Sequence, residues 1–120
     1  MSRRRKDLGD WGEAEAARHL EMKGYTIVGR QVRTGPGEID LVALDRETLV
    51  FVEVKALVRV PGDGVDPAEN VHQRKQRRLG MAARAYLAGL DHEPYCRFDV
   101  VTLVREPALR VEHHAGAFIL

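Results

Sequence analysis

The sequence has little cysteine and no long apolar segment, and both absences exclude classes of protein. Cys96 is the only cysteine in 120 residues, which excludes an intramolecular disulfide and a zinc site built from paired cysteines. No apolar run approaches the length of a membrane span. The basic start at residues 1–6 is followed by Asp7, Gly9 and Asp10 instead of the apolar core of a signal peptide. These features predict a cytoplasmic protein without membrane attachment.

The sequence also lacks an excess of charge of either sign, and it contains few aromatic residues. The formal net charge is +1, so nucleic-acid binding must be argued from where the charges lie. Aromatic residues make up 6% of the chain, too few to predict a stacking surface for RNA bases. The 44% hydrophobic and 31% charged residues are typical of a folded domain. We expect a single domain over residues 1–120, in which residues 1–6 form a flexible basic tail.

Apolar periodicity and turn residues predict the element order α-β-β-β-α-β-β, which is an α/β fold with a mixed sheet flanked by helices. Gly24 is a typical residue just after a helix C-terminus, and Asp66 followed by Pro67 is typical of a helix start. The polar residues 45–48 between two apolar runs predict a β-hairpin. The expected helices are Asp7–Lys23 and Asp66–Ala88, and the expected strands are Tyr25–Val32, Glu38–Leu44, Leu49–Lys55, Arg97–Arg105 and Leu109–His114.

The predicted hairpin brings three charged side chains together. Side chains alternate along a strand, so Glu53 and Lys55 share one face, and Asp40 on the preceding strand can lie beside Glu53. Both faces of Leu49–Lys55 are otherwise apolar, which predicts a central strand that is buried on both sides. Ionisable groups in such a strand form either a structural salt bridge between Lys55 and a neighbouring acid or a functional site.

The functional interpretation is chemically specific. Two neighbouring carboxylates repel each other unless a cation lies between them, and Mg²⁺ or Mn²⁺ prefers such oxygen ligands. The ion can polarise a phosphodiester and acidify a bound water. The Lys55 ammonium can hold that water or stabilise the charge that develops on the phosphate. We therefore predict that Asp40 and Glu53 bind the metal and that Lys55 is catalytic.

Two further charged residues interrupt apolar stripes of the predicted helices. Glu13 shares its stripe of the first helix with small and apolar residues, so it either reaches water near the helix start or points at a metal ion. Lys75 interrupts the stripe of the second helix, where it either extends to solvent or reaches toward phosphate. Spacing alone leaves both alternatives open. Asp99 in a later strand is expected to pair with Arg97 in a structural role.

Several motifs carry a resemblance to a known superfamily. The segments Gly37–Ala43 (GEIDLVA) and Leu49–Lys55 (LVFVEVK) resemble the core of the PD-(D/E)xK nucleases, and the chain is most similar to the small bacterial YraN family. Ile39 stands where the proline that names the superfamily would be. The resemblance covers nearly the whole chain and extends to Gly12–Ala16, Gly24–Tyr25, Val71 with Lys75, Arg97–Val101 and His114–Phe118.

The resemblance implies a restriction-endonuclease-like core that is related to the Holliday junction resolvases. It implies that Asp40 and Glu53 are metal ligands and that Lys55 is the catalytic lysine. Related resolvases use a glutamate of the first helix at the metal site, which adds Glu13 to the expected ligands. With Lys75 as a further catalytic group, the expected site comprises five residues.

Basic residues gather in two places that suit a phosphate backbone. One cluster comprises Arg74, Lys75, Arg77 and Arg78, and the other is Arg3–Lys6; the alternative is a solvated helix face and a tail. We predict a Mg²⁺-dependent endonuclease that hydrolyses phosphodiester bonds in DNA, with branched or single-stranded DNA of repair or recombination as candidate substrates. The alternative is a non-catalytic nucleic-acid-binding module of such an assembly. Duplex cleavage needs two cuts, which suggests a homodimer, but no interface can be identified in the sequence.

Overall fold

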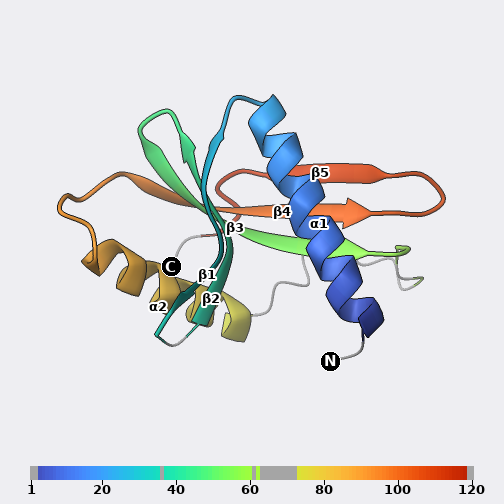
Figure 1. The fold of residues 1–120 in the computed structure, drawn as a ribbon, viewed down its shortest axis with the longest axis horizontal. Coiled ribbons are helices and arrows are strands. Elements are labelled where there is room, and N and C mark those ends of the chain that lie inside the picture. Colours follow the sequence, from blue (N-terminus) through green and yellow to red (C-terminus); the bar gives the residue numbers. More distant parts are fainter. Residues whose placement is uncertain (1–2, 36, 61, 63–72, 119–120) are drawn as a thin grey trace.

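The computed structural model describes residues 3–35, 37–60, 62 and 73–118, and only the backbone of Gln73 and Arg74. Its elements follow the order α-β-β-β-α-β-β (Figure 1), which confirms the predicted α/β class. The helices are α1 (Arg3–Met22) and α2 (Gln73–Ala88), and the strands are β1 (Thr26–Thr34), β2 (Gly37–Asp45), β3 (Thr48–Leu57), β4 (Cys96–Val104) and β5 (Arg110–His114). Neither helix in this part of the chain combines the length and the apolar character needed to cross a lipid bilayer.

The described strands form one mixed sheet in the order β1-β2-β3-β4-β5. β3 and β4 run parallel, whereas the other neighbouring pairs are antiparallel. Parallel neighbours need a long crossover instead of a tight turn, and the chain between β3 and β4 contains α2. Figure 1 shows α1 lying across β3 and β4, while α2 lies beside β1 and β2. The two helices therefore cover different parts of the sheet.

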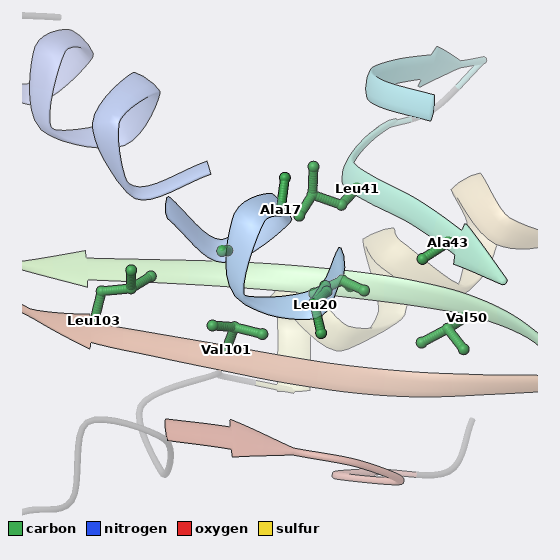
Figure 2. Close-up of a cluster of buried hydrophobic side chains, with 9 residues drawn as sticks. Ala17, Leu20, Leu41, Ala43, Val50, Val101 and Leu103 are labelled. Carbon is green, nitrogen blue, oxygen red and sulfur yellow. The ribbon is translucent and has the colours of Figure 1, made fainter. Parts of the chain in front are cut away.

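Two apolar cores lie on opposite faces of the sheet and share β3. Val50 and Val52 belong to the core under α1, whereas Leu49 and Phe51 belong to the core under α2. The prediction that this strand is central and covered on both faces is therefore confirmed. Figure 2 shows the α1 core, whose buried members are Ala16, Ala17, Leu20, Leu41, Ala43, Val50, Val52, Val101 and Leu103.

The start of α1 differs from the prediction, whereas the strand ends lie within two residues of theirs. The helix begins at Arg3 instead of Asp7, so Arg3–Lys6 form its first turn and are not a separate tail. The prediction missed this turn because it contains no apolar residue to extend the periodic pattern, although arginine and lysine are good helix formers. Gly24 ends the helix region with a φ of 95°, as expected. The predicted second-helix start at Asp66 lies outside the described residues.

A buried polar network joins β4 to β5 and to β2. The fully buried Asp99 carboxylate accepts hydrogen bonds from Arg97 Nε at 2.8 Å and, where the ring carries its proton on Nε2, from His113 at 2.7 Å. Arg97 also donates to the Tyr25 hydroxyl at 2.6 Å and to Asp45 at 3.1 Å. Burial alone would raise the pKa of Asp99, but these donors outweigh it and hold the pKa below its usual value. The expected pairing of Asp99 with Arg97 is confirmed.

Asp99→Asn is expected to lower the free energy of unfolding by roughly 2–4 kcal/mol, because it leaves the Arg97 guanidinium without its buried counter-charge. Urea denaturation measures this change. Asp91 is the matched control, because it also contacts a histidine, at 2.8 Å, yet its side chain is 99% exposed. Asp91→Asn should leave stability nearly unchanged, and an equal loss in both variants would contradict the structural role of the network.

Candidate metal and phosphodiester site

Asp40 lies where β2 separates from β3. The two strands pair regularly up to Leu41 opposite Val52, and Asp40 is the next residue of β2. Its Oδ2 accepts the backbone N–H of Val54 at 2.8 Å, so the carboxylate replaces the backbone partner that β3 lacks there. Extending the register by one residue puts Asp40 opposite Glu53. The hairpin thus brings the two acids together, as the alternation of side chains predicts.

Glu53 is the buried member of this acidic pair, with 4% of its surface exposed. Lys75 reaches it from α2, and the ammonium forms an ion pair with Glu53 Oε1. Burial lowers the pKa of Lys75, but the charges of Glu53 and Asp40 more than offset this effect and raise the pKa overall. Lys75 is therefore a cation held against the acidic pair, and its side chain is still 55% exposed toward solvent.

Glu13 approaches the acidic pair from α1. The helix can come close to β3 at this point because Gly12 has no Cβ; a Cβ there would lie 2.6 Å from that of Ala56. Glu13 Oε2 accepts a hydrogen bond from Gln31 Nε2 at 2.7 Å. The carboxyl therefore points toward the sheet and is held by a side chain of β1.

Gln31 is a site residue that the sequence analysis missed. It has a φ of 47°, a left-handed conformation that is uncommon for a residue other than glycine and recurs at functional sites. The residue type glutamine does not by itself predict a left-handed backbone conformation. The available signal was Gly29, because an isolated glycine in a strand often marks a bulge, and the pairing of β1 with β2 does shift between Ile27 and Gly29.

Burial and the charges of neighbouring acids raise the pKa of two carboxyls of the site, Asp40 and Glu13. Burial raises the pKa of Asp40 from 3.8 to about 7, and the charge of Glu53 adds to the increase. Burial also raises the pKa of Glu13 from 4.5 to about 7; the Gln31 hydrogen bond opposes this, and Asp40 and Glu38 add to it. A divalent cation would relieve the repulsion and favour the ionised form of these groups.

These side chains line one cavity of about 540 Å³. Its lining combines cations from both helices with the carboxyls of Asp10, Glu13, Glu38, Asp40 and Glu53, and Asp10 forms an ion pair with Lys6 at 3.1 Å. The cations are Arg5 and Lys6 from α1 and Lys75 and Arg78 from α2. The cavity therefore offers oxygen ligands to a metal ion and positive charge to a phosphate in the same place.

The remaining predicted residues lie around this cavity. Lys55 is half-buried beyond Glu53 on β3 and is not among the lining residues; burial lowers its pKa, and the charge of Lys75 lowers it further. No hydrogen bond or ion pair of Lys55 occurs among the described residues, so the structural salt bridge finds no support. Arg77 is exposed on α2 outside the lining, and the Arg74 side chain lies outside the described part.

The donor set fits a divalent ion held by two carboxylates. Within the described residues, no preformed group of three or more His, Cys, Asp or Glu side chains could hold a metal. Mg²⁺ and Mn²⁺ do not require one, since Mg²⁺ commonly binds one or two carboxylates and completes its shell with water and phosphate. Asp40 and Glu53 would supply these carboxylates, and Glu13 would act as a third acid beside the pair.

The fold and the cavity together define a small α/β protein with an acid pair where β2 separates from β3. A family model described as "Uncharacterised protein family UPF0102" matches residues 12–103. The chain is 44% identical to a UPF0102 protein of Chlorobaculum tepidum, over 94% of this chain and 92% of the relative. It is 49% identical to one of Symbiobacterium thermophilum, over 89% and 87% respectively. The chain therefore belongs to the UPF0102 family, which confirms the resemblance to YraN proteins.

Proposed function

We propose that this UPF0102 protein is a Mg²⁺- or Mn²⁺-dependent endonuclease that hydrolyses phosphodiester bonds in DNA. The observation that carries the proposal is the acidic pair at the fork of β2 and β3, in which Asp40 is half-buried, Glu53 is buried and the Lys75 ammonium lies against Glu53. Perturbed carboxyls in a cavity that also contains cations are typical of functional sites. A purely structural ion pair would not need a third acid from α1.

The carboxylates of Asp40 and Glu53 would hold the ion, which when bound would polarise the phosphodiester and acidify a water. The Val54 N–H keeps Asp40 in place for this role. Lys75 lies at the pair and can stabilise the negative charge that develops on the phosphate. Lys55 follows Glu53 by two residues on β3 and would be a further catalytic ammonium near the pair.

Glu13 supplies a group that can exchange protons near neutral pH. Its pKa of about 7 lets it accept a proton from a water or return one to a leaving oxygen. The hydrogen bond from Gln31 fixes the direction of its carboxyl. A homodimer would supply the two sites that cleavage of both strands requires.

Cleavage assays test the proposal on linear, single-stranded, flapped and four-way DNA with Mg²⁺, Mn²⁺ or a chelator. We expect metal-dependent cleavage of at least one substrate, and no cleavage with the chelator or by Asp40→Asn. Binding of DNA without cleavage of any of the four substrates would overturn the nuclease proposal and favour the non-catalytic binding module.

Lys75→Met is expected to separate metal binding from cleavage. Removing the ammonium frees Glu53 and takes away a positive charge, so calorimetry should show metal binding that is tighter by a few-fold. Cleavage should fall by about 10²-fold, because the phosphate loses its cation. Arg84→Met, an exposed change on the same helix, is the control. Weaker metal binding in Lys75→Met would contradict the competition between Lys75 and the ion for Glu53.

A further inference from the structure

A groove lies next to the cavity that contains Glu13, Asp40 and Glu53, and Arg5 lines both of them. The groove has a volume of about 570 Å³ and is lined by Arg4, Arg5, Asp7, Leu8, Val58 and Arg105. Three arginines and one aspartate line the groove, so the formal charge of its lining is positive, although the whole chain is nearly neutral. Arg4 and Arg105 are exposed. This concentration of charge suits an anionic partner.

The groove is assembled from three separate parts of the chain that are tied together. Arg4 comes from the first turn of α1, Val58 follows β3 and Arg105 follows β4. The backbone N–H of Arg105 donates to the Leu57 carbonyl at 3.0 Å, which fixes the ends of β3 and β4 relative to each other. The Arg105 guanidinium lies 5.3 Å from the centre of the Trp11 ring, a cation–π contact with α1. Arg105 is therefore held in place before any ligand binds.

Cations continue from the cavity into this groove. The first turn of α1 separates the two, with Arg5 and Lys6 lining the cavity and Arg4 and Arg5 lining the groove. A nucleic-acid strand carries a negative charge on every nucleotide, so it needs a path of this kind beyond the scissile bond. Leu8 and Val58 add apolar surface to the lining of the groove. A small anion would occupy either the cavity or the groove, whereas a nucleic-acid strand is long enough to occupy both.

We propose that the groove formed by Arg4, Arg5 and Arg105 beside Trp11 binds the phosphate backbone of a DNA strand where it leaves the cavity. The inference rests on the proposed function and adds a binding path to it. Phosphate contacts position a strand without reading its sequence, so binding here is independent of sequence. The strand would cross the first turn of α1, which the sequence analysis assigned to a tail.

Trp11 gives a direct readout, because it is the only tryptophan of the chain. Wild-type protein is titrated with an oligothymidylate of about 12 nucleotides in the presence of a chelator, so that binding is measured without cleavage. We expect the fluorescence emission of Trp11 to change on DNA binding. This change should saturate at the same DNA concentration as the fluorescence anisotropy of a labelled copy of the same DNA. Saturating DNA binding with unchanged Trp11 emission would overturn the proposal.

The salt dependence of binding tests the arginines themselves. Each phosphate contact that is lost should reduce the slope of log K against log salt by about 0.7, so Arg4→Gln with Arg105→Gln should reduce it by about 1.4. Arg84→Gln is the matched control, because Arg84 is exposed on α2 and lines neither the cavity nor the groove. Arg105→Lys should retain the slope. Equal slopes for the double variant, the wild type and Arg84→Gln would overturn the proposal.

These experiments distinguish a failure of the groove proposal from a failure of the nuclease proposal. Metal-dependent cleavage with unchanged slopes in the double variant would reject the groove alone. Neither binding nor cleavage by the wild type would reject both. A matched oligouridylate is the second probe, and binding of RNA without binding of DNA would overturn the assignment of the groove to a DNA strand.

Discussion

Glu53→Gln is expected to reduce metal-dependent DNA cleavage by at least about 10³-fold. Glutamine keeps the shape of the side chain but removes the buried charge that would attract the ion. It also leaves the Lys75 ammonium without its partner, so the positive charge at the site would then repel a divalent cation. Initial rates on the best DNA substrate measure the loss, and calorimetry of Mn²⁺ binding should show a parallel loss of affinity.

Glu47→Gln is the control for this variant. Glu47 lies in the turn of the same hairpin and is exposed, so the same chemical change there should leave cleavage and metal affinity as in the wild type. Circular dichroism verifies that both variants are folded. Cleavage at the wild-type rate by a folded Glu53→Gln protein would contradict its role as a metal ligand.

Without metal, the protein is expected to become less stable as the pH rises from about 4 to about 8. Asp40 and Glu13 keep their protons up to a pH of about 7 in the folded state, whereas the unfolded chain releases them near 3.8 and 4.5. The folded state therefore binds more protons in this interval, and the free energy of unfolding decreases with pH. For Asp40 alone, a pKa raised from 3.8 to about 7 corresponds to a decrease on the order of 4 kcal/mol over this interval.

Asp40→Asn isolates this effect from other titrating groups. Burial, aided by Lys23, lowers the pKa of His19, and a lowered histidine pKa makes stability rise with pH instead. His19 is present in both proteins, so its contribution cancels in the difference between wild type and Asp40→Asn. We expect Asp40→Asn to be the more stable of the two at pH 8 in chelator, by chemical denaturation. A wild type that gains stability relative to this variant between pH 5 and pH 8 would contradict the prediction.

Adding Mg²⁺ or Mn²⁺ should reverse the trend. The ion binds the ionised carboxylates, so it should raise the unfolding temperature more at pH 8 than at pH 5. Asp40→Asn should show little of this stabilisation. An equal increase for wild type and variant would mean that the ion binds elsewhere.

The acidic pair was predictable because it depends on two short-range rules. Strand alternation puts Glu53 on a defined face, and a short turn fixes which residue of β2 lies opposite. The placement of Glu13 and Lys75 followed from the 3.6-residue period, since each interrupts an apolar stripe. The period indicates which face a charge occupies but not its partner, and the partner of Lys75 is known only from the structure.

Other parts of the site depend on contacts between distant segments. The left-handed φ of Gln31 comes from an irregular β1 that packs against α1 and β2, and no local propensity predicts it. The contact of Arg105 with Trp11 joins residues that are far apart in the sequence. The first turn of α1 was missed because it is wholly basic, although this is the turn that borders both the cavity and the groove.

A crystal structure of the protein with Mn²⁺ at about pH 8 tests the central claim most directly. The account predicts an anomalous difference peak between the carboxylates of Asp40 and Glu53, and loss of that peak in Asp40→Asn. Saturating Mn²⁺ with no peak at this pair, and with the Lys75 ammonium still against Glu53, would contradict it.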